Sequence, residues 1–243
     1  MFPAARSIRT NDIDMAVYEQ GDGIPVIFVH GFPELAFSWR YQLPAVAAAG
    51  YRAIAPDMRG YGATDKPDSV ENYSIQHLVG DLEGLLDALQ IDRAHFVAHD
   101  WGAVLSWQFS LLAPHRMLSL VALNIPFFPR PPADPITLMR AALGDDFYIV
   151  NFQDSDEADR RCDADPKRVF EVMMRKNMRS RERFNTLPKA KRVFSILAAL
   201  KRKKLSGELL LSSEELQFYA DTFSAGGFTA PINWYRNLSL IHI

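Results

Sequence analysis

The sequence predicts an α/β fold in which a mostly parallel β-sheet carries helices on both faces. Short runs of Val, Ile, Ala, Phe and Leu without polar alternation are typical of strands buried on both faces, and they alternate with segments of helix length. Strands separated by helices favour parallel pairing through right-handed crossovers. The chain has 243 residues, 48% of them hydrophobic, which is enough for one large domain with an insertion.

The predicted elements follow in a regular order. An alternating run at 13–19 suits an antiparallel edge strand. The buried strands are expected at 26–30, 52–57, 95–99 and 119–124, with helices at 37–49, 75–89 and 101–112. A proline-rich linker follows, and residues 136–237 show helical periodicity without another buried strand. We therefore expect the N-terminal part of the core at 1–127, an all-helical cap at 128–237 and a short return toward the core at 238–243.

Composition and charge exclude several classes of function. Lys and Arg number 27 against 29 Asp and Glu, so the chain lacks the positive charge that binds nucleic acid or anionic membranes. No apolar run is long enough to span a membrane, and the charged N-terminal segment does not fit a signal peptide. The single cysteine, Cys162, can form no internal disulfide and belongs to no metal-binding motif. We expect a cytoplasmic protein without metal or cofactor.

The third buried strand runs directly into Val97-Ala98-His99-Asp100-Trp101-Gly102-Ala103, after which a helix begins. A residue between strand and helix, with a small residue two positions to either side, is typical of the strained turn that exposes a nucleophile. Asp100 occupies that position. Its carboxylate can attack an sp³ carbon and form an alkyl ester, which water then hydrolyses. Capping of the following helix is the alternative role for this aspartate.

A second segment, His30-Gly31-Phe32-Pro33-Glu34, follows the first buried strand. In this architecture the loop at that place supplies one backbone N–H to an oxyanion, and the residue after the nucleophile supplies the other. Phe32 and Trp101 are therefore the predicted oxyanion donors. The residues predicted to support the two motifs are His30, Gly31, Pro33, His99 and Gly102.

The chain resembles the soluble epoxide hydrolases of the α/β-hydrolase superfamily in four motifs: HGFPE at 30–34, DMRGYGATDKP at 57–67, AHDWGA at 98–103 and INWYRN at 232–237. The resemblance extends over roughly residues 13–237. It implies that a small-molecule epoxide is hydrolysed to a vicinal diol through an ester on Asp100, a reaction of detoxification. It also implies that Tyr148 and Tyr235 donate hydrogen bonds to the epoxide oxygen.

The tyrosine pair and Trp101 separate this function from that of a dehalogenase. Opening of an unactivated epoxide expels a poor leaving group, so a phenol with a pKa of about 10 lowers the barrier. A haloalkane or haloacid dehalogenase would use the same Asp nucleophile. However, a fluoroacetate dehalogenase is expected to have Arg where this chain has Trp101, and a haloalkane dehalogenase needs no tyrosine pair. The other alternative is a non-catalytic binding protein with the hydrolase fold.

The resemblance further implies a general base, a His after the last strand, and an acid that orients it. Only His242 lies beyond the cap, and no strand separates it from Tyr235, so we do not expect it to be the base. We expect two strand–helix units that carry the base and its acid to be missing from this chain, about 60 residues at ~30 per unit. Alkylation of Asp100 would survive this loss, whereas turnover would be slower.

Overall fold

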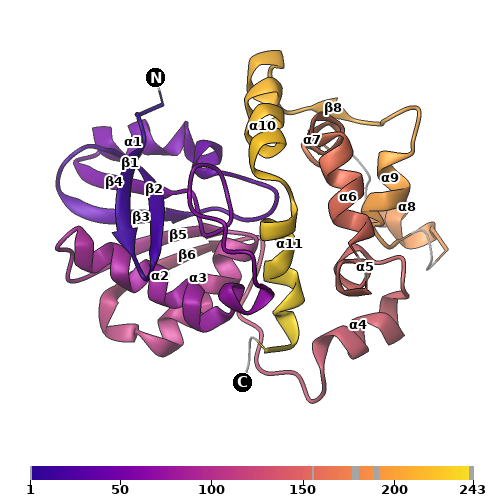
Figure 1. Cartoon of the computed structure of the whole chain (residues 1–243), viewed down its shortest axis with the longest axis horizontal. Helices are drawn as coiled ribbons and strands as arrows, with labels where there is room; N and C mark the ends of the chain where they lie inside the picture. The colour runs from indigo at the N-terminus through magenta and orange to yellow at the C-terminus, as the bar shows by residue number, and fades with distance from the viewer. Residues whose placement is uncertain (1, 155, 177–180, 189–191, 241–243) are drawn as a thin grey trace. The chain divides into compact units, whose positions relative to one another are not determined.

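The computed structural model describes the chain except for residues 1, 155, 177–180, 189–191 and 241–243. The chain divides into two compact units: unit 1 at Met1–Pro129 and unit 2 at Arg130–His242. Figure 1 shows the large sheet in unit 1 and a set of helices in unit 2.

Unit 1 is built on a six-stranded sheet with the order β1-β2-β4-β3-β5-β6. The strands β4, β3, β5 and β6 are parallel, whereas β2 pairs antiparallel with both β1 and β4. The strands are β1 (Arg6–Thr10), β2 (Ile13–Gln20), β3 (Ile24–Val29), β4 (Tyr51–Pro56), β5 (Ala94–His99) and β6 (Met117–Leu123). This mostly parallel sheet confirms the predicted fold class.

Helices cover both faces of the sheet in unit 1. Figure 1 shows α1 (Gln42–Ala48) on one side of the strands, and α2 (Ile75–Ala88) and α3 (Trp101–Leu112) on the other. Short 3₁₀ turns complete the connections: η1 (Ala36–Trp39), η2 (Val70–Tyr73) and η3 (Pro114–Arg116). Because both faces are covered, Ile27, Ile54 and Phe96 in the central strands are fully buried, as continuous apolar runs predict.

The structure differs from the predicted elements at the sides of the sheet. The strand β1, which has only two buried residues and pairs with β2, is not among the predicted strands. The edge position predicted for residues 13–19 is therefore wrong. At the other side β6 is the last strand of the described sheet, and its Leu118, Val121 and Leu123 are exposed, as expected for an apolar strand left at the edge of a sheet. The predicted helix at 37–49 divides into η1 and α1.

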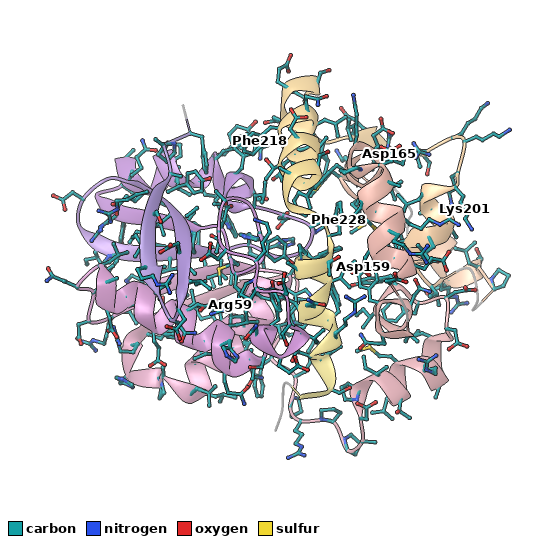
Figure 2. All side chains as sticks on the ribbon, in the orientation of Figure 1. Arg59, Asp159, Asp165, Lys201, Phe218 and Phe228 are labelled. Carbon is teal, nitrogen blue, oxygen red and sulfur yellow. The ribbon has the colours of Figure 1, made fainter. Side chains whose placement is uncertain are left out.

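A buried ion pair fixes the loop after β4 to α2. The guanidinium of Arg59, labelled in Figure 2, donates to both carboxylate oxygens of Asp81, at 2.7 Å from Nε and 2.6 Å from Nη2. The two side chains are 3% and 0% exposed. Asn11 completes the cluster, since its carbonyl oxygen accepts from Arg59 and its amide donates to Asp81. Such a buried carboxylate is tolerated because each oxygen has a charged partner.

Unit 2 consists of helices and one short pair of strands. Its elements are α4 (Pro135–Leu143), α5 (Tyr148–Asp154), α6 (Glu157–Ala164), α7 (Pro166–Met173), β7 (Arg175–Lys176), α8 (Arg181–Thr186), α9 (Ile196–Leu200), β8 (Glu208–Leu209), α10 (Ser213–Gly226), α11 (Thr229–Arg236) and η5 (Leu238–Leu240). The antiparallel pair β7–β8 corrects the expectation of an all-helical cap. Gly207 permits it, because a Cβ there would lie 2.3 Å from the carbonyl oxygen of Lys176. None of the helices described here is long and apolar enough to cross a membrane.

Contacts at both ends of α11 hold this helix within unit 2. Arg236 donates to both carboxylate oxygens of Asp159 in α6, at 3.0 and 2.7 Å, and Asp159 is 4% exposed. Phe228, which precedes α11 and is labelled with Asp159 in Figure 2, packs against Phe223 and Phe170 at centroid distances of 4.6 and 6.3 Å. The start and the end of α11 are thus both fixed to neighbouring helices.

We expect Arg59→Ala to lower the free energy of unfolding by about 3–5 kcal/mol, because it leaves the Asp81 carboxylate buried without its ion pair. Urea denaturation followed by circular dichroism measures this loss. The control is Arg9→Ala, which removes a surface pair with Asp14 at 3.6 Å and should change stability by about 0.5 kcal/mol or less. Equal effects of the two substitutions would contradict the prediction.

Candidate active site

Asp100 lies at the turn between β5 and α3, at the carboxyl end of a central parallel strand. Its backbone has φ 55° and ψ −123°, a conformation that residues other than glycine rarely adopt. The side chain does not make the hydrogen bond of an N-cap, which comes from the second or third residue of a helix, so the alternative N-cap role is not realised. The backbone is therefore strained at the residue where the sequence predicts the strained turn of a nucleophile.

Two backbone N–H groups donate to the Asp100 carboxylate. The N–H of Phe32 lies 3.0 Å from Oδ1, and the N–H of Trp101 makes a second hydrogen bond. Burial raises the pKa of Asp100, and these two hydrogen bonds oppose that rise because they stabilise the ionised form. Both residues predicted as oxyanion donors are thus brought to the predicted nucleophile.

Two glycines allow the backbone segments to approach this closely. A Cβ at Gly31 would lie 2.4 Å from the Cβ of Asp100, and a Cβ at Gly102 would lie 2.2 Å from the carbonyl oxygen of Val29. Any larger side chain would separate the loop after β3 from the turn after β5. The glycines of the two motifs therefore support the site through their lack of a side chain.

His30 and Pro33 shape the loop that carries the Phe32 donor. The buried His30 ring places Nδ1 2.9 Å from the carbonyl oxygen of Gly31, and its Nε2 accepts from the backbone N–H of Met58 at 3.0 Å. These contacts require a neutral ring with the proton on Nδ1, and burial correspondingly lowers the pKa of His30. The peptide bond between Phe32 and Pro33 is cis. It lies in a turn that is closed by a hydrogen bond of 2.9 Å from the backbone N–H of Glu34 to the carbonyl oxygen of Gly31.

A contact between Glu34 and His99 that the sequence does not predict lies beside Asp100. The Glu34 Oε2 and His99 Nδ1 atoms are 2.9 Å apart, and the side chains are 16% and 35% exposed. The hydrogen bond to Glu34 raises the pKa of His99. Burial opposes ionisation of Glu34, but the hydrogen bond and charge of His99 outweigh it and lower the pKa of Glu34. From the sequence, His99 is predicted only as a supporting residue; the Glu34 of HGFPE is the signal that could have pointed to this contact.

In unit 2 the structure brings Tyr148 and Tyr235 together. Tyr148 begins α5 and Tyr235 lies in α11, and their ring centroids are 5.8 Å apart at an interplanar angle of 75°. Phe152 contacts both rings, at 5.6 and 5.0 Å. The amide of Gln153 donates to the carbonyl oxygen of Tyr235 at 2.9 Å, which joins the two helices next to the pair. Gln153 is a supporting residue that is not among the predicted site residues.

The remaining reactive groups are the Cys162 thiol, the side chains that could bind a metal ion, and His242. Cys162 is buried, and burial raises its pKa to about 12, so the thiol is un-ionised at neutral pH. Within the described parts of the chain, no three His, Cys, Asp or Glu side chains gather where they could hold a metal ion. His242 lies outside the described residues.

Comparisons with known proteins agree with this arrangement. Residues 24–166 match the family described as alpha/beta hydrolase fold. Epoxide hydrolase 3 of Siraitia grosvenorii is 41% identical over 236 residues, which cover 96% of this chain and 72% of that protein. Epoxide hydrolase A of Mycobacterium tuberculosis is 40% identical, with 97% of this chain and 74% of that protein covered.

Solved structures point to the same proteins. The crystal structure of Epoxide Hydrolase A from Mycobacterium thermoresistibile matches with a TM-score of 0.84 and 37% identity, over 98% of this chain and 75% of that one. An epoxide hydrolase from Vigna radiata matches with a TM-score of 0.79 and 38% identity, over 97% of this chain and 72% of that one. With its parallel sheet and its strained Asp100 turn, this chain belongs to the epoxide hydrolases of the alpha/beta hydrolase fold.

Proposed function

We propose that the protein adds water to a small-molecule epoxide to give a vicinal diol, with Asp100 as the nucleophile. The observation that carries this proposal is the Asp100 carboxylate on a strained turn, held by the backbone N–H groups of Phe32 and Trp101. The names of the relatives support an epoxide as the substrate class. The proposed reaction uses no metal and no cofactor.

The first step is a displacement at a ring carbon. Asp100 Oδ2 attacks the carbon, the carbon–oxygen bond of the ring breaks, and an alkyl ester forms on Asp100. Oδ1 becomes the carbonyl oxygen of the ester and keeps its hydrogen bond from Phe32. When water adds to this carbonyl, negative charge develops on Oδ1, where one preorganised donor contributes about 3 kcal/mol. Collapse of the intermediate releases the diol and restores the carboxylate.

Tyr148 and Tyr235 are the proposed donors to the epoxide oxygen. Ring opening places negative charge on this oxygen, and a phenol hydrogen bond or proton stabilises it in the transition state. The edge-to-face contact of the two rings, which holds both tyrosines on adjoining helices of unit 2, supports a joint role. A carboxylate with two phenols suits an epoxide, whose leaving oxygen stays attached to the substrate.

Hydrolysis of the ester also requires a general base that takes a proton from water. His30 has both ring nitrogens in hydrogen bonds, and His99 is paired with Glu34. His95 contacts the hydroxyl of Ser119. We assign no general base among the residues that the structure describes. Ring opening, measured as adduct or diol, is therefore the step that tests the proposed function.

Incubation with styrene oxide should add the mass of one epoxide to the intact protein or release the diol, and peptide mapping of any adduct should locate it on Asp100. Asp100→Ala should abolish both products because it removes the nucleophile. The matched control is Asp92→Ala, which removes an aspartate whose side chain is 91% exposed. An adduct that persists in Asp100→Ala, or neither product from the unmodified chain, would contradict the assignment.

The same assay separates the alternatives. Halide release from a haloalkane, without reaction of the epoxide, would indicate a dehalogenase. Saturable binding of the epoxide with neither adduct nor diol would indicate a binding protein.

The double substitution Tyr148→Phe with Tyr235→Phe should slow ring opening by about 10²–10⁴-fold, because it removes both proton donors and keeps the rings. The rate is measured as adduct plus diol in single-turnover mixing. Tyr219→Phe is the control, since Tyr219 is a buried tyrosine of the same unit that stacks on Phe170. A double variant within a few-fold of the unmodified rate would rule out the proposed role.

A further inference from the structure

We propose that unit 2 carries a basic surface that docks on an anionic lipid bilayer. The basic surface consists of residues 165–176 and 200–210, which hold eight Lys and Arg against three Asp and Glu. The rest of the chain holds 19 Lys and Arg against 26 Asp and Glu. The expectation that the chain lacks the charge to bind anionic membranes rests on the total of −2, which hides this separation. Docking is measured without an epoxide, so the inference does not depend on the proposed reaction.

Four consecutive cations at 201–204 form the centre of the basic surface. They follow α9 directly, and Lys201, labelled in Figure 2, is the C-cap of this helix. All four residues are exposed, and none of them forms an ion pair with a residue that the structure describes. Their charge is therefore available to an anionic partner.

Two arginines fix the loop that presents these cations. Arg168 in α7 donates from Nε to the carbonyl oxygen of Leu200 at 3.4 Å, and from Nη2 to that of Arg202. Arg175 in β7 donates from Nη1 to the carbonyl oxygen of Gly207 at 2.6 Å. Because these guanidinium groups hold the loop at both ends, its backbone loses less conformational freedom on binding than a free segment would.

The three carboxylates of the basic surface do not neutralise this loop. Glu171 pairs with Arg168 at 2.9 Å. Asp165, also labelled in Figure 2, is the N-cap of α7 and accepts from the backbone N–H of Arg168 at 2.9 Å. Glu208 lies opposite Lys176 in the β7–β8 ladder. The four loop cations therefore keep the surface positive, and its field extends over a Debye length of about 8 Å at physiological salt.

An exposed leucine on the same surface favours a bilayer over other polyanions. Leu210 follows β8, its backbone N–H donates to the carbonyl oxygen of Met174 at 2.9 Å, and the residue is 59% exposed. Basic side chains attract anionic headgroups, and an apolar side chain beside them gains free energy by entering the membrane interface. A single-stranded nucleic acid instead stacks its bases on exposed aromatic rings. The only aromatic residue in 165–176 and 200–210 is Phe170, which is fully buried.

The test is cosedimentation of the full chain with phosphatidylcholine vesicles that contain about 30% phosphatidylserine, compared with vesicles of phosphatidylcholine alone. We expect binding to the anionic vesicles only, and weaker binding as the salt concentration rises, because salt screens exposed charges. Lys203→Glu with Lys204→Glu should weaken binding at least about 25-fold, since each basic residue near an anionic surface contributes about fivefold. Leu210→Ser should weaken binding by a few-fold, because it removes the apolar side chain.

The matched control is Arg9→Glu with Arg93→Glu, which changes the net charge of the chain by the same amount. Both arginines lie in unit 1, with side chains 62% and 56% exposed. Their replacement should leave the affinity within about threefold, because the attraction depends on charge near the bilayer. If the variant at 203 and 204 does not fold by circular dichroism, Lys203→Gln with Lys204→Gln takes its place, with a loss of about 25-fold expected.

Absence of binding, binding that needs no phosphatidylserine, or equal losses in the two Glu variants would overturn the proposal. Tighter binding to polyglutamate or to single-stranded DNA than to the anionic vesicles would also overturn it, in favour of an acidic protein or a nucleic acid. An unchanged affinity in Leu210→Ser would overturn the insertion of this leucine.

Discussion

The hydrogen bond from the Phe32 N–H to Asp100 Oδ1 joins two turns that lie far apart in the chain, and the chemistry of the site depends on it. β3 and β5 are adjacent parallel strands, so their carboxyl ends meet at one edge of the sheet and bring these turns together. Burial opposes the charge of Asp100, and fixed backbone dipoles offset that cost without side-chain entropy. The strain at Asp100 persists because packing on both sides determines its backbone.

Buried polar groups hold these turns more firmly than apolar packing alone would. Asp57, which is 2% exposed, accepts hydrogen bonds from the backbone N–H groups of Ala36 and Ala63 and from the hydroxyl of Tyr18. It thereby joins the loops after β3 and β4 to a neighbouring strand. A fully satisfied network of this kind specifies one arrangement, since any shift leaves a buried charge without a partner. The neutral ring of His30 also joins the loops after β3 and β4, through its hydrogen bonds to the backbone of Gly31 and Met58.

Unit 2 solves a different physical problem, which is to hold two phenols together on helices that are distant in the sequence. The Arg236–Asp159 pair fixes the end of α11 to α6, and Phe152 lies against both tyrosine rings. Aromatic rings in edge-to-face contact constrain each other's orientation. The proposed nucleophile thus lies on a turn of the sheet, and the proposed proton donors lie on packed helices.

The sequence by itself determined the fold class, the Asp100 turn and its two backbone donors, because continuous apolar runs and small residues around a turn are local patterns. The roles of Tyr148 and Tyr235 were predicted from the resemblance alone, and the structure places their ring centroids 5.8 Å apart. Only the tertiary structure decided the pairing of β1, the β7–β8 ladder and the contact of Glu34 with His99. These features depend on segments far apart in the chain, 65 residues for Glu34 and His99, and their free energy comes from contacts that no local pattern encodes.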